Sequence, residues 1–208
     1  MPPVRQPRAD AGIPRPKPSN QGNDPGRLFI ISGPGGAGKG SIVSRVVASD
    51  PSLWLSRSWT TRVPRSGEAE DAYCFVTRED FKAKIASGGF LEWAEVVGEL
   101  YGTPVPEAPA GSDVVLEIDV QGAAQVLGRR PDARMILVLA PSREAQEQRL
   151  RGRGDSEEHI LRRLRIAPSE ENAGRRLADH VVINDDLERT VAEVCAIISR
   201  YRGNVASG

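Results

Sequence analysis

A glycine-rich stretch near residue 35 has the residue types and the spacing to bind phosphate. Residues 33–39 fit the pattern G-x-x-x-x-G-K, which starts at Gly33 and ends at Gly38 and Lys39. Glycines let several backbone N–H groups approach one phosphate because no Cβ stands in the way. The lysine and the amino end of a following helix add positive charge. We therefore predict a phosphate-binding loop, in preference to the alternative of a tight turn with an incidental surface lysine.

Other charged residues could bind a second anion. Arg62 and Arg65 flank a proline that stiffens the loop between them, and two guanidinium groups suit a doubly charged phosphate. Taken alone, such a pair is more often surface charge. Glu117 and Asp119 end an apolar stretch and, as strand residues, would point to one side at the edge where α/β sheets bind ligands. Between residues 143 and 176, arginines alternate with glutamates, and an Arg-Gly-Arg-Gly turn among them suits a hinge.

The elements that must position these residues are predicted from apolar runs and turn residues. Strands are expected at 28–31, 53–55, 73–76, 90–97, 114–119, 134–140 and 180–184. Helices are expected from residue 42, over 78–86 and 122–127, from 143 to about 150, over 157–165, and around 187–198. Thr77 is expected to cap the helix at 78–86, and Ser142 the helix that starts at 143. Pro168 is expected to stop the helix at 157–165, and residues 101–104 are expected to form a turn.

Strands that alternate with helices predict an α/β fold in which helices flank a parallel sheet on both faces. We expect a core of residues 26–55, 113–141 and 171–205, an insertion at 56–112 and an arginine-rich helical lid at 142–170. Residues 1–25 hold seven of the sixteen prolines and little to bury, so we expect a disordered tail, in preference to a basic tether.

Length, charge and cysteine content narrow the class of protein. The 208 residues suit one domain with inserted subdomains, and 28 basic residues balance 28 acidic ones, so no nucleic-acid partner is expected. Two cysteines far apart in sequence indicate neither a disulfide framework nor a metal motif. Because the sequence shows no long apolar run and no signal peptide, we expect a cytoplasmic protein with no membrane partner. The oligomeric state stays open.

A phosphate loop, a second anion site and a hinged flap together indicate phosphoryl transfer between two bound ligands. An acceptor phosphate is already anionic at neutral pH, so the reaction needs no general base. Catalysis can rest on positioning and charge neutralisation. The flap would exclude water, which would otherwise take the phosphoryl group.

Several longer motifs carry a resemblance to a known family. They are Ser58 with Thr60-Thr61-Arg62-x-Pro64-Arg65-x-Gly67-Glu68, Leu91-Glu92-Trp93-Ala94-Glu95, Tyr101-Gly102-Thr103, Glu117-Ile118-Asp119-x-Gln121-Gly122, Arg149-Leu150-x-Gly152-Arg153-Gly154 and Val182-Ile183-Asn184. With the phosphate loop, they make roughly residues 27–200 resemble the guanylate kinase family of nucleoside monophosphate kinases. The resemblance implies a P-loop kinase fold with an inserted GMP-binding subdomain and a helical lid.

The resemblance also implies an ATP:GMP phosphotransferase that acts on GMP and dGMP with Mg²⁺ as cofactor. Its ATP site would comprise Gly33, Pro34, Gly35, Gly36, Ala37, Gly38, Lys39, Gly40 and Ser41, with Asn184 near the adenine. Its catalytic residues would be Lys39, Arg149, Arg153 and Arg163. Arg62, Arg65, Tyr73 and Tyr101 would bind the GMP phosphate; Glu92, Ser58 and Thr103 would read guanine; Glu68, Glu117 and Asp119 would complete the GMP site. Ser41 and Asp119 would hold Mg²⁺, mostly through water.

The sequence departs from the family pattern in several places. Gly40 replaces the usual Mg²⁺-binding hydroxyl, Gly35 stands where serine is common, and the segment between Glu68 and Tyr73 is one residue short. Residues 104–112 are short and proline-rich, and Pro168 falls after the flap. Two alternatives stay open: a related kinase that phosphorylates a sugar phosphate, and a guanylate-kinase-like module that binds peptides without catalysis. The retained base-reading residues argue against the first, and the retained Lys39 and arginines argue against the second.

Overall fold

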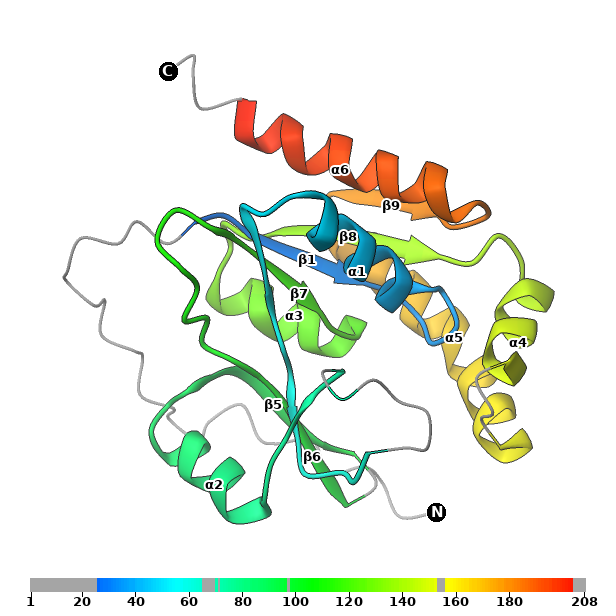
Figure 1. Ribbon diagram of the computed structural model, residues 1–208. Coiled ribbons are helices and arrows are strands. Elements are labelled where there is room, and N and C mark those ends of the chain that lie inside the picture. The colour runs from blue at the N-terminus through cyan, green and yellow to red at the C-terminus, as the bar shows by residue number, and fades with distance from the viewer. Residues whose placement is uncertain (1–25, 65–69, 71, 97, 153–155, 204–208) are drawn as a thin grey trace.

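The main sheet has five parallel strands in the order β2-β7-β1-β8-β9 (Figure 1). The computed structural model describes residues 26–64, 70, 72–96, 98–152 and 156–203. The strands are β1 (Leu28–Ser32), β2 (Leu53–Ser56), β7 (Asp113–Glu117), β8 (Arg134–Leu139) and β9 (His180–Ile183). The predicted parallel α/β sheet is therefore confirmed.

Helices cover both faces of this sheet. Helices α1 (Lys39–Ser49) and α6 (Leu187–Gly203) share one apolar core with Phe29 and Ile31 of β1. The opposite face packs against α3 (Val120–Arg129), with α5 (Glu157–Leu177) beside it, and receives Leu28 and Ile30. Because successive strand side chains alternate between faces, burial on both sides explains the unbroken apolar run of β1.

A second, four-stranded sheet in the order β4-β3-β6-β5 lies at one end of the main sheet (Figure 1). Its strands are β3 (Trp59–Thr60), β4 (Cys74–Phe75), β5 (Phe90–Val96) and β6 (Glu99–Pro104), and α2 (Arg78–Ala86) packs on it. Phe81 of α2 stacks on Phe90 with ring centroids 4.5 Å apart. The predicted cap of α2 is confirmed, since the Thr77 hydroxyl accepts from the backbone N–H of Asp80 at 3.1 Å.

The predicted turn at residues 101–104 is wrong, because these residues belong to β6. Tyr101 and Gly102 pair with Ala94 and Trp93 of β5 in an antiparallel ladder. The chain reverses earlier, next to Gly98, whose φ of 82° suits glycine. Pro104 comes last in the strand, a position where a missing N–H matters least.

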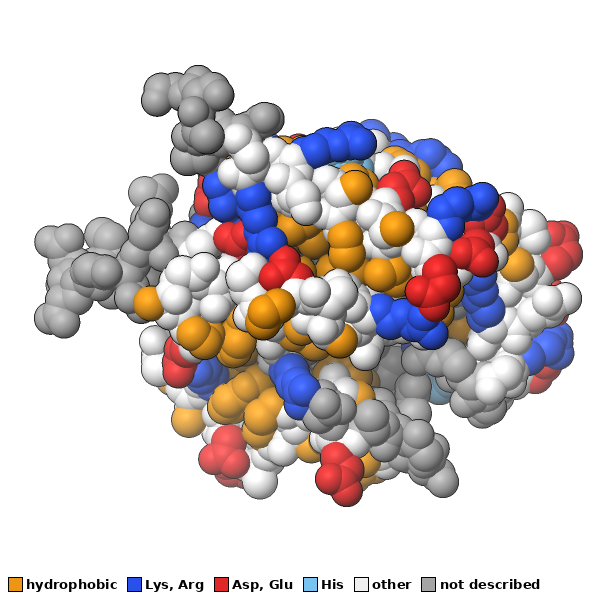
Figure 2. All heavy atoms as spheres, turned by 45° about the horizontal axis from the view of Figure 1, so that its top comes forward, with side chains coloured by type: hydrophobic (Ala, Val, Ile, Leu, Met, Phe, Trp, Pro, Cys, Tyr) orange, Lys and Arg blue, Asp and Glu red, His pale blue; other side chains and the backbone are white. Residues whose placement is uncertain are grey.

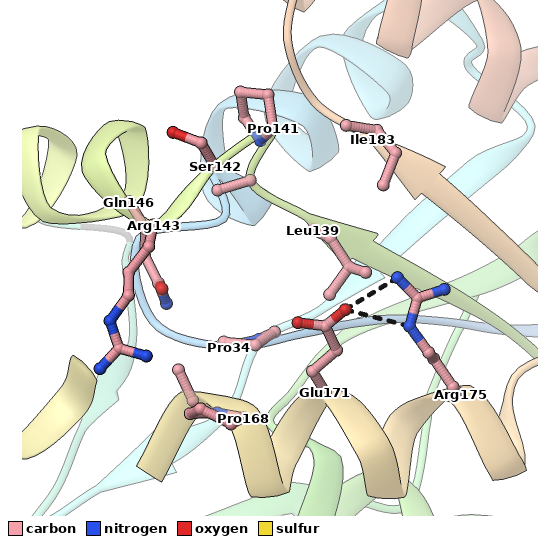
Figure 3. Close-up of a pocket in the computed structure, with 12 residues that line it drawn as sticks. Pro34, Leu139, Pro141, Ser142, Arg143, Gln146, Pro168, Glu171, Arg175 and Ile183 are labelled. Atoms are coloured by element: carbon pink, nitrogen blue, oxygen red, sulfur yellow. Dashed lines mark hydrogen bonds and ion pairs between the residues drawn. The ribbon is translucent and has the colours of Figure 1, made fainter. Parts of the chain in front are cut away.

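The predicted end of a helix before Pro168 is also wrong, because α5 continues through this proline to Leu177. Proline has no N–H to donate to the carbonyl four residues earlier, which is that of Leu164. Arg143, the first residue of α4 (Arg143–Gly152), supplies a donor instead: its Nη2 donates to the Leu164 carbonyl at 2.6 Å. In Figure 3, Arg143 extends from α4 toward α5 beside Pro168. The predicted Ser142 cap of α4 is confirmed, since its hydroxyl accepts from the N–H of Ala145 at 3.1 Å.

Arg202 near the end of α6 joins distant parts of the core. Its Nε donates to Asp113 at 2.7 Å and its Nη1 donates to Asp50, which follows α1. Hydrogen bonds from the Ser52 hydroxyl and from Arg202 lower the pKa of Asp50 to about 2. These contacts tie the last helix to the end of α1 and the start of β7.

Acidic and basic side chains are interspersed on the face that Figure 2 shows, without a broad patch of one sign. None of the helices in the described residues is long and apolar enough to cross a membrane. The expected division into core, insertion and lid stays a prediction, although α5 spans the boundary expected near residue 170. The expected disordered tail lies outside the described residues.

Candidate active site

The glycine-rich loop connects β1 to α1 as the sequence predicts. Gly38 lies just before α1 with a φ of 92°, and a Cβ there would stand 2.3 Å from the Asn184 side-chain nitrogen. The positive φ favours glycine at this position, and any side chain there would have to displace the Asn184 amide. The Lys39 ammonium group curls back over the loop and donates to the carbonyls of Gly33 at 2.7 Å and Pro34 at 3.1 Å. The lysine therefore lies where phosphate groups would meet the loop.

Residues from α4 and from the end of β9 hold the far side of this loop. The Asn184 amide donates to the Ala37 carbonyl at 2.8 Å. Arg149 donates to the same carbonyl at 3.2 Å and to the Asn184 carbonyl at 2.7 Å. Gln146, which the sequence analysis did not select, donates to the Gly35 carbonyl at 2.6 Å. The structure thus brings the predicted Arg149 and Asn184 to the phosphate loop.

A cleft of about 370 Å³ separates the loop from the second sheet. Of the predicted site residues, Gly33, Gly35, Lys39, Ser58, Arg62, Tyr73, Glu92, Tyr101, Glu117, Asp119 and Arg163 line it. Pro34, Gly36, Ala37, Gly38, Gly40, Ser41, Arg149 and Asn184 lie at the loop or behind it, outside the cleft lining. Arg65, Glu68 and Arg153 lie outside the described residues.

Aromatic rings position Arg62 on one wall of the cleft. Its guanidinium carbon lies 5.4 Å from the Tyr73 ring centroid and 5.5 Å from that of Phe75. Tyr73 in turn meets Tyr101 edge to face at 6.2 Å. Cation–π attraction favours this guanidinium position. The sequence analysis did not select Phe75 as a site residue, although Phe75 lies in the predicted strand at 73–76, two residues after Tyr73.

Glu92 occupies another part of the wall, on β5. The Thr103 hydroxyl donates to Glu92 Oε1 at 2.6 Å, and both side chains are buried. Burial raises the pKa of Glu92, against the smaller opposing effect of the Thr103 hydrogen bond. Arg129 of α3 donates to the carbonyls of Phe90 and Leu91 and so ties this strand to the core. Thr103 lies behind Glu92 and is absent from the cleft lining.

Carboxylates surround the loop lysine at the centre of the cleft. Burial lowers the pKa of Lys39, while Glu117, Asp119 and Glu170 oppose this shift. Burial, together with Asp119, raises the pKa of Glu170. Strand β7 ends at Glu117, so Asp119 is not a strand residue. The expectation that strand alternation points Glu117 and Asp119 to the same side is therefore wrong. Asp119 instead caps α3 by accepting from the Gly122 N–H at 2.7 Å, and still reaches the cleft.

Helix α5 contributes cleft residues that sequence reasoning missed. The missed residues are Arg162, Ile166 and Glu170, which line the cleft together with the predicted Arg163. The residues at 163, 166 and 170 are spaced three and four apart, which places them on one helical face. The expected stop at Pro168 hid this pattern, because it left Glu170 outside the helix.

The oxygen donors near the loop fit Mg²⁺. In the described ranges no three His, Cys, Asp or Glu side chains cluster closely enough to hold a metal ion by themselves. Mg²⁺ commonly binds through one or two carboxylates, water and substrate phosphates, so a full protein cage is unnecessary. A Cβ at Gly40 would stand 3.6 Å from a Glu117 oxygen, which places the first turn of α1 beside a carboxylate. Ser41 follows in that turn.

A phosphate loop after β1, a doubly covered parallel sheet and a second sheet across the cleft define a kinase of the P-loop class. The sequence model of the guanylate kinase family matches residues 25–201. The chain belongs to the guanylate kinase family.

Known relatives agree over most of the chain. The guanylate kinase of Parasynechococcus marenigrum (strain WH8102) is 46% identical over 175 residues, which cover 81% of this chain and 96% of that protein. The guanylate kinase of Rubrobacter xylanophilus (strain DSM 9941) is 46% identical over 181 residues, which cover 84% and 94%. The crystal structure of guanylate kinase from Anaplasma phagocytophilum matches with a TM-score of 0.66 at 29% identity, covering 85% of this chain and 86% of that one.

Proposed function

We propose that this enzyme transfers the γ-phosphoryl group of ATP to GMP or dGMP and releases ADP and the corresponding nucleoside diphosphate. One observation carries the proposal: a single cleft gathers Lys39 of the phosphate loop with Arg62 and Glu92 of the second sheet. A donor phosphate at the loop and an acceptor nucleotide on the second sheet would therefore share one cleft. Family membership and the names of the relatives support the same reaction.

The acceptor site is proposed on the second sheet. Arg62, supported by its aromatic neighbours, binds the GMP phosphate, and Tyr101 adds a hydroxyl group. The Glu92 carboxylate accepts hydrogen bonds from guanine N1–H and the 2-amino group, and Ser58 contacts the remaining edge of the base. Adenine lacks these adjacent donors, so AMP would shield the buried carboxylate from water without donating to it, which penalises AMP binding.

The donor site is proposed at the loop. Backbone N–H groups of residues 35–41 and the Lys39 ammonium group bind the ATP phosphates, and Arg149 and Arg163 neutralise charge on the transferring group. A GMP phosphate oxygen forms the new bond to the γ-phosphorus while the bond to the β,γ-bridging oxygen breaks, so ADP leaves with that oxygen. Ser41 and Asp119 would hold Mg²⁺, mostly through water, and a bound Mg²⁺ would supply further charge neutralisation.

A coupled assay of ADP release tests this function. The purified chain receives ATP, Mg²⁺ and one acceptor at a time: GMP, dGMP, AMP, UMP or a sugar phosphate. We expect turnover with GMP and dGMP and little with the other acceptors, and we expect Lys39→Ala to abolish it. Turnover with the sugar phosphate alone, or none with any acceptor from a folded protein, would overturn the proposal.

A further inference from the structure

Gln146 of α4 reaches the phosphate loop with a hydrogen bond to its backbone. The side-chain Nε2 donates to the Gly35 carbonyl at 2.6 Å, and the side chain is only 8% exposed. In Figure 3, Gln146 extends from α4 toward the loop that carries Pro34, and both residues line a pocket of about 260 Å³ between the loop, α4 and α5. Gln146 is therefore a buried polar side chain that donates to the loop.

The peptide that Gln146 contacts has little conformational restraint of its own. Gly35 and Gly36 are the only adjacent glycines within residues 33–39, so no Cβ limits rotation of the peptide that joins them. Gly35 also stands where serine is common in the family, a departure that the proposed function leaves unexplained. A loop that presents its N–H groups to phosphate needs a contact from outside to fix this peptide.

A hydrogen bond to the Gly35 carbonyl also fixes the next N–H group. The peptide group is planar and trans, so the Gly36 N–H points opposite to the Gly35 carbonyl. Because that carbonyl points to Gln146, the Gly36 N–H points away from α4. The Asn184 amide bonds the Ala37 carbonyl in the same way at 2.8 Å. Side chains that bind these carbonyls from outside the loop thus leave the following N–H groups free to meet a ligand.

Close packing keeps α4 against this peptide. Gly36 has a φ of 84°, and a Cβ there would lie 2.9 Å from Gln146 Cγ and 2.9 Å from the Gln146 carbonyl oxygen. A side chain at position 36 would push the helix away from the loop. Glycine at this position therefore allows the Gln146 amide to reach the Gly35 carbonyl.

We infer that Gln146 is a positioning residue for phosphoryl transfer, which holds the peptide between Gly35 and Gly36 so that the Gly36 N–H faces the donor phosphates. The identity of the donor nucleotide rests on the proposed function. An N–H that is already oriented need not be ordered when the nucleotide binds, which favours binding. Loss of the Gln146 donor should therefore weaken ATP binding and leave GMP binding unchanged.

Steady-state kinetics with ATP and GMP test the inference. Gln146→Met keeps an unbranched side chain but has no donor, and we expect KM for ATP to rise about 3- to 10-fold while KM for GMP stays unchanged. Gln146→Leu also lacks a donor and should give the same result, so it replaces the methionine variant if that variant fails to fold. Gln148→Met is the matched control, because Gln148 is exposed on the same helix and its loss should alter neither KM.

Glycine-selective ¹⁵N labelling gives a readout that does not depend on turnover. Addition of ADP with Mg²⁺ should move the Gly36 amide proton downfield in the unaltered enzyme, because this N–H then donates to phosphate. The movement should be smaller in Gln146→Met. Equal increases of KM for both nucleotides, an unchanged KM for ATP, or the same Gly36 movement in both proteins would overturn the inference. Absence of GMP turnover by the unaltered enzyme would instead overturn the proposed function.

Discussion

The hydrogen bond between Arg143 and the Leu164 carbonyl should stabilise the protein only while residue 168 is proline. Helix α5 passes through Pro168, which cannot donate to that carbonyl, and Arg143 Nη2 donates to it at 2.6 Å. The informative perturbation is therefore a pair of changes, Arg143→Ala and Pro168→Ala. Alone, the first change removes a hydrogen-bond donor from the carbonyl of Leu164, a buried residue.

The magnitudes follow from the geometry of this contact. An unsatisfied carbonyl costs about 1–3 kcal/mol, and partial access of water favours the lower end, so Arg143→Ala should lower the free energy of unfolding by about 1 kcal/mol. Pro168→Ala should raise it by less than the roughly 3 kcal/mol that separates these residues in an ordinary helix, because Arg143 already satisfies the carbonyl. In the Pro168→Ala background the alanine N–H takes over, and Arg143→Ala should cost close to zero.

Urea unfolding of the four proteins measures the coupling. We expect a double-mutant coupling energy of about 1 kcal/mol, which is within the range for residues in contact. Arg175→Ala is the matched control: Arg175 also lies on α5 but forms an exposed ion pair with Glu171 at 2.8 Å (Figure 3). Such pairs contribute about 0–1 kcal/mol and should not couple to residue 168. Additive effects of Arg143→Ala and Pro168→Ala would refute the reasoning.

Two other predictions concern metal use and acid stability. Gly40→Ser should lower the Mg²⁺ concentration needed for half-maximal activity, because the serine hydroxyl adds an oxygen ligand and the new Cβ fits 3.6 Å from a Glu117 oxygen. Gly40→Ala is the control, since it adds the Cβ without the hydroxyl. An unchanged Mg²⁺ titration in Gly40→Ser would contradict the prediction. The pKa of Asp50 is about 2 in the folded protein and about 3.9 in the unfolded chain. The ionised carboxylate therefore stabilises the folded state above about pH 4, and this stabilisation is lost as the pH falls toward 2. Asp50→Asn should therefore flatten the loss of stability between pH 4 and pH 2 in urea midpoints, whereas parallel pH profiles would show that Asp50 has no such role.

The sequence by itself determined the features that depend on neighbouring residues. The phosphate loop is encoded within residues 33–39, where Gly33, Gly36 and Gly38 have positive φ angles that favour glycine. The caps of α2 and α4 depend on side chains that bond to N–H groups three residues away. The apolar run of β1 indicates burial on both faces without reference to what covers it. Family motifs also predicted most residues of the cleft lining.

Tertiary structure alone decided the features whose hydrogen-bond partners are distant in sequence. Residues 101–104 form a strand because β3 and β5 pair with them on both sides. Helix α5 continues through Pro168 because Arg143, twenty-one residues from Leu164, supplies the missing donor. The Thr103 hydroxyl turns toward Glu92 only because the antiparallel register places them opposite. In each case the hydrogen-bond partner is brought close only by folding. The residues next to it in sequence do not indicate where that partner will lie.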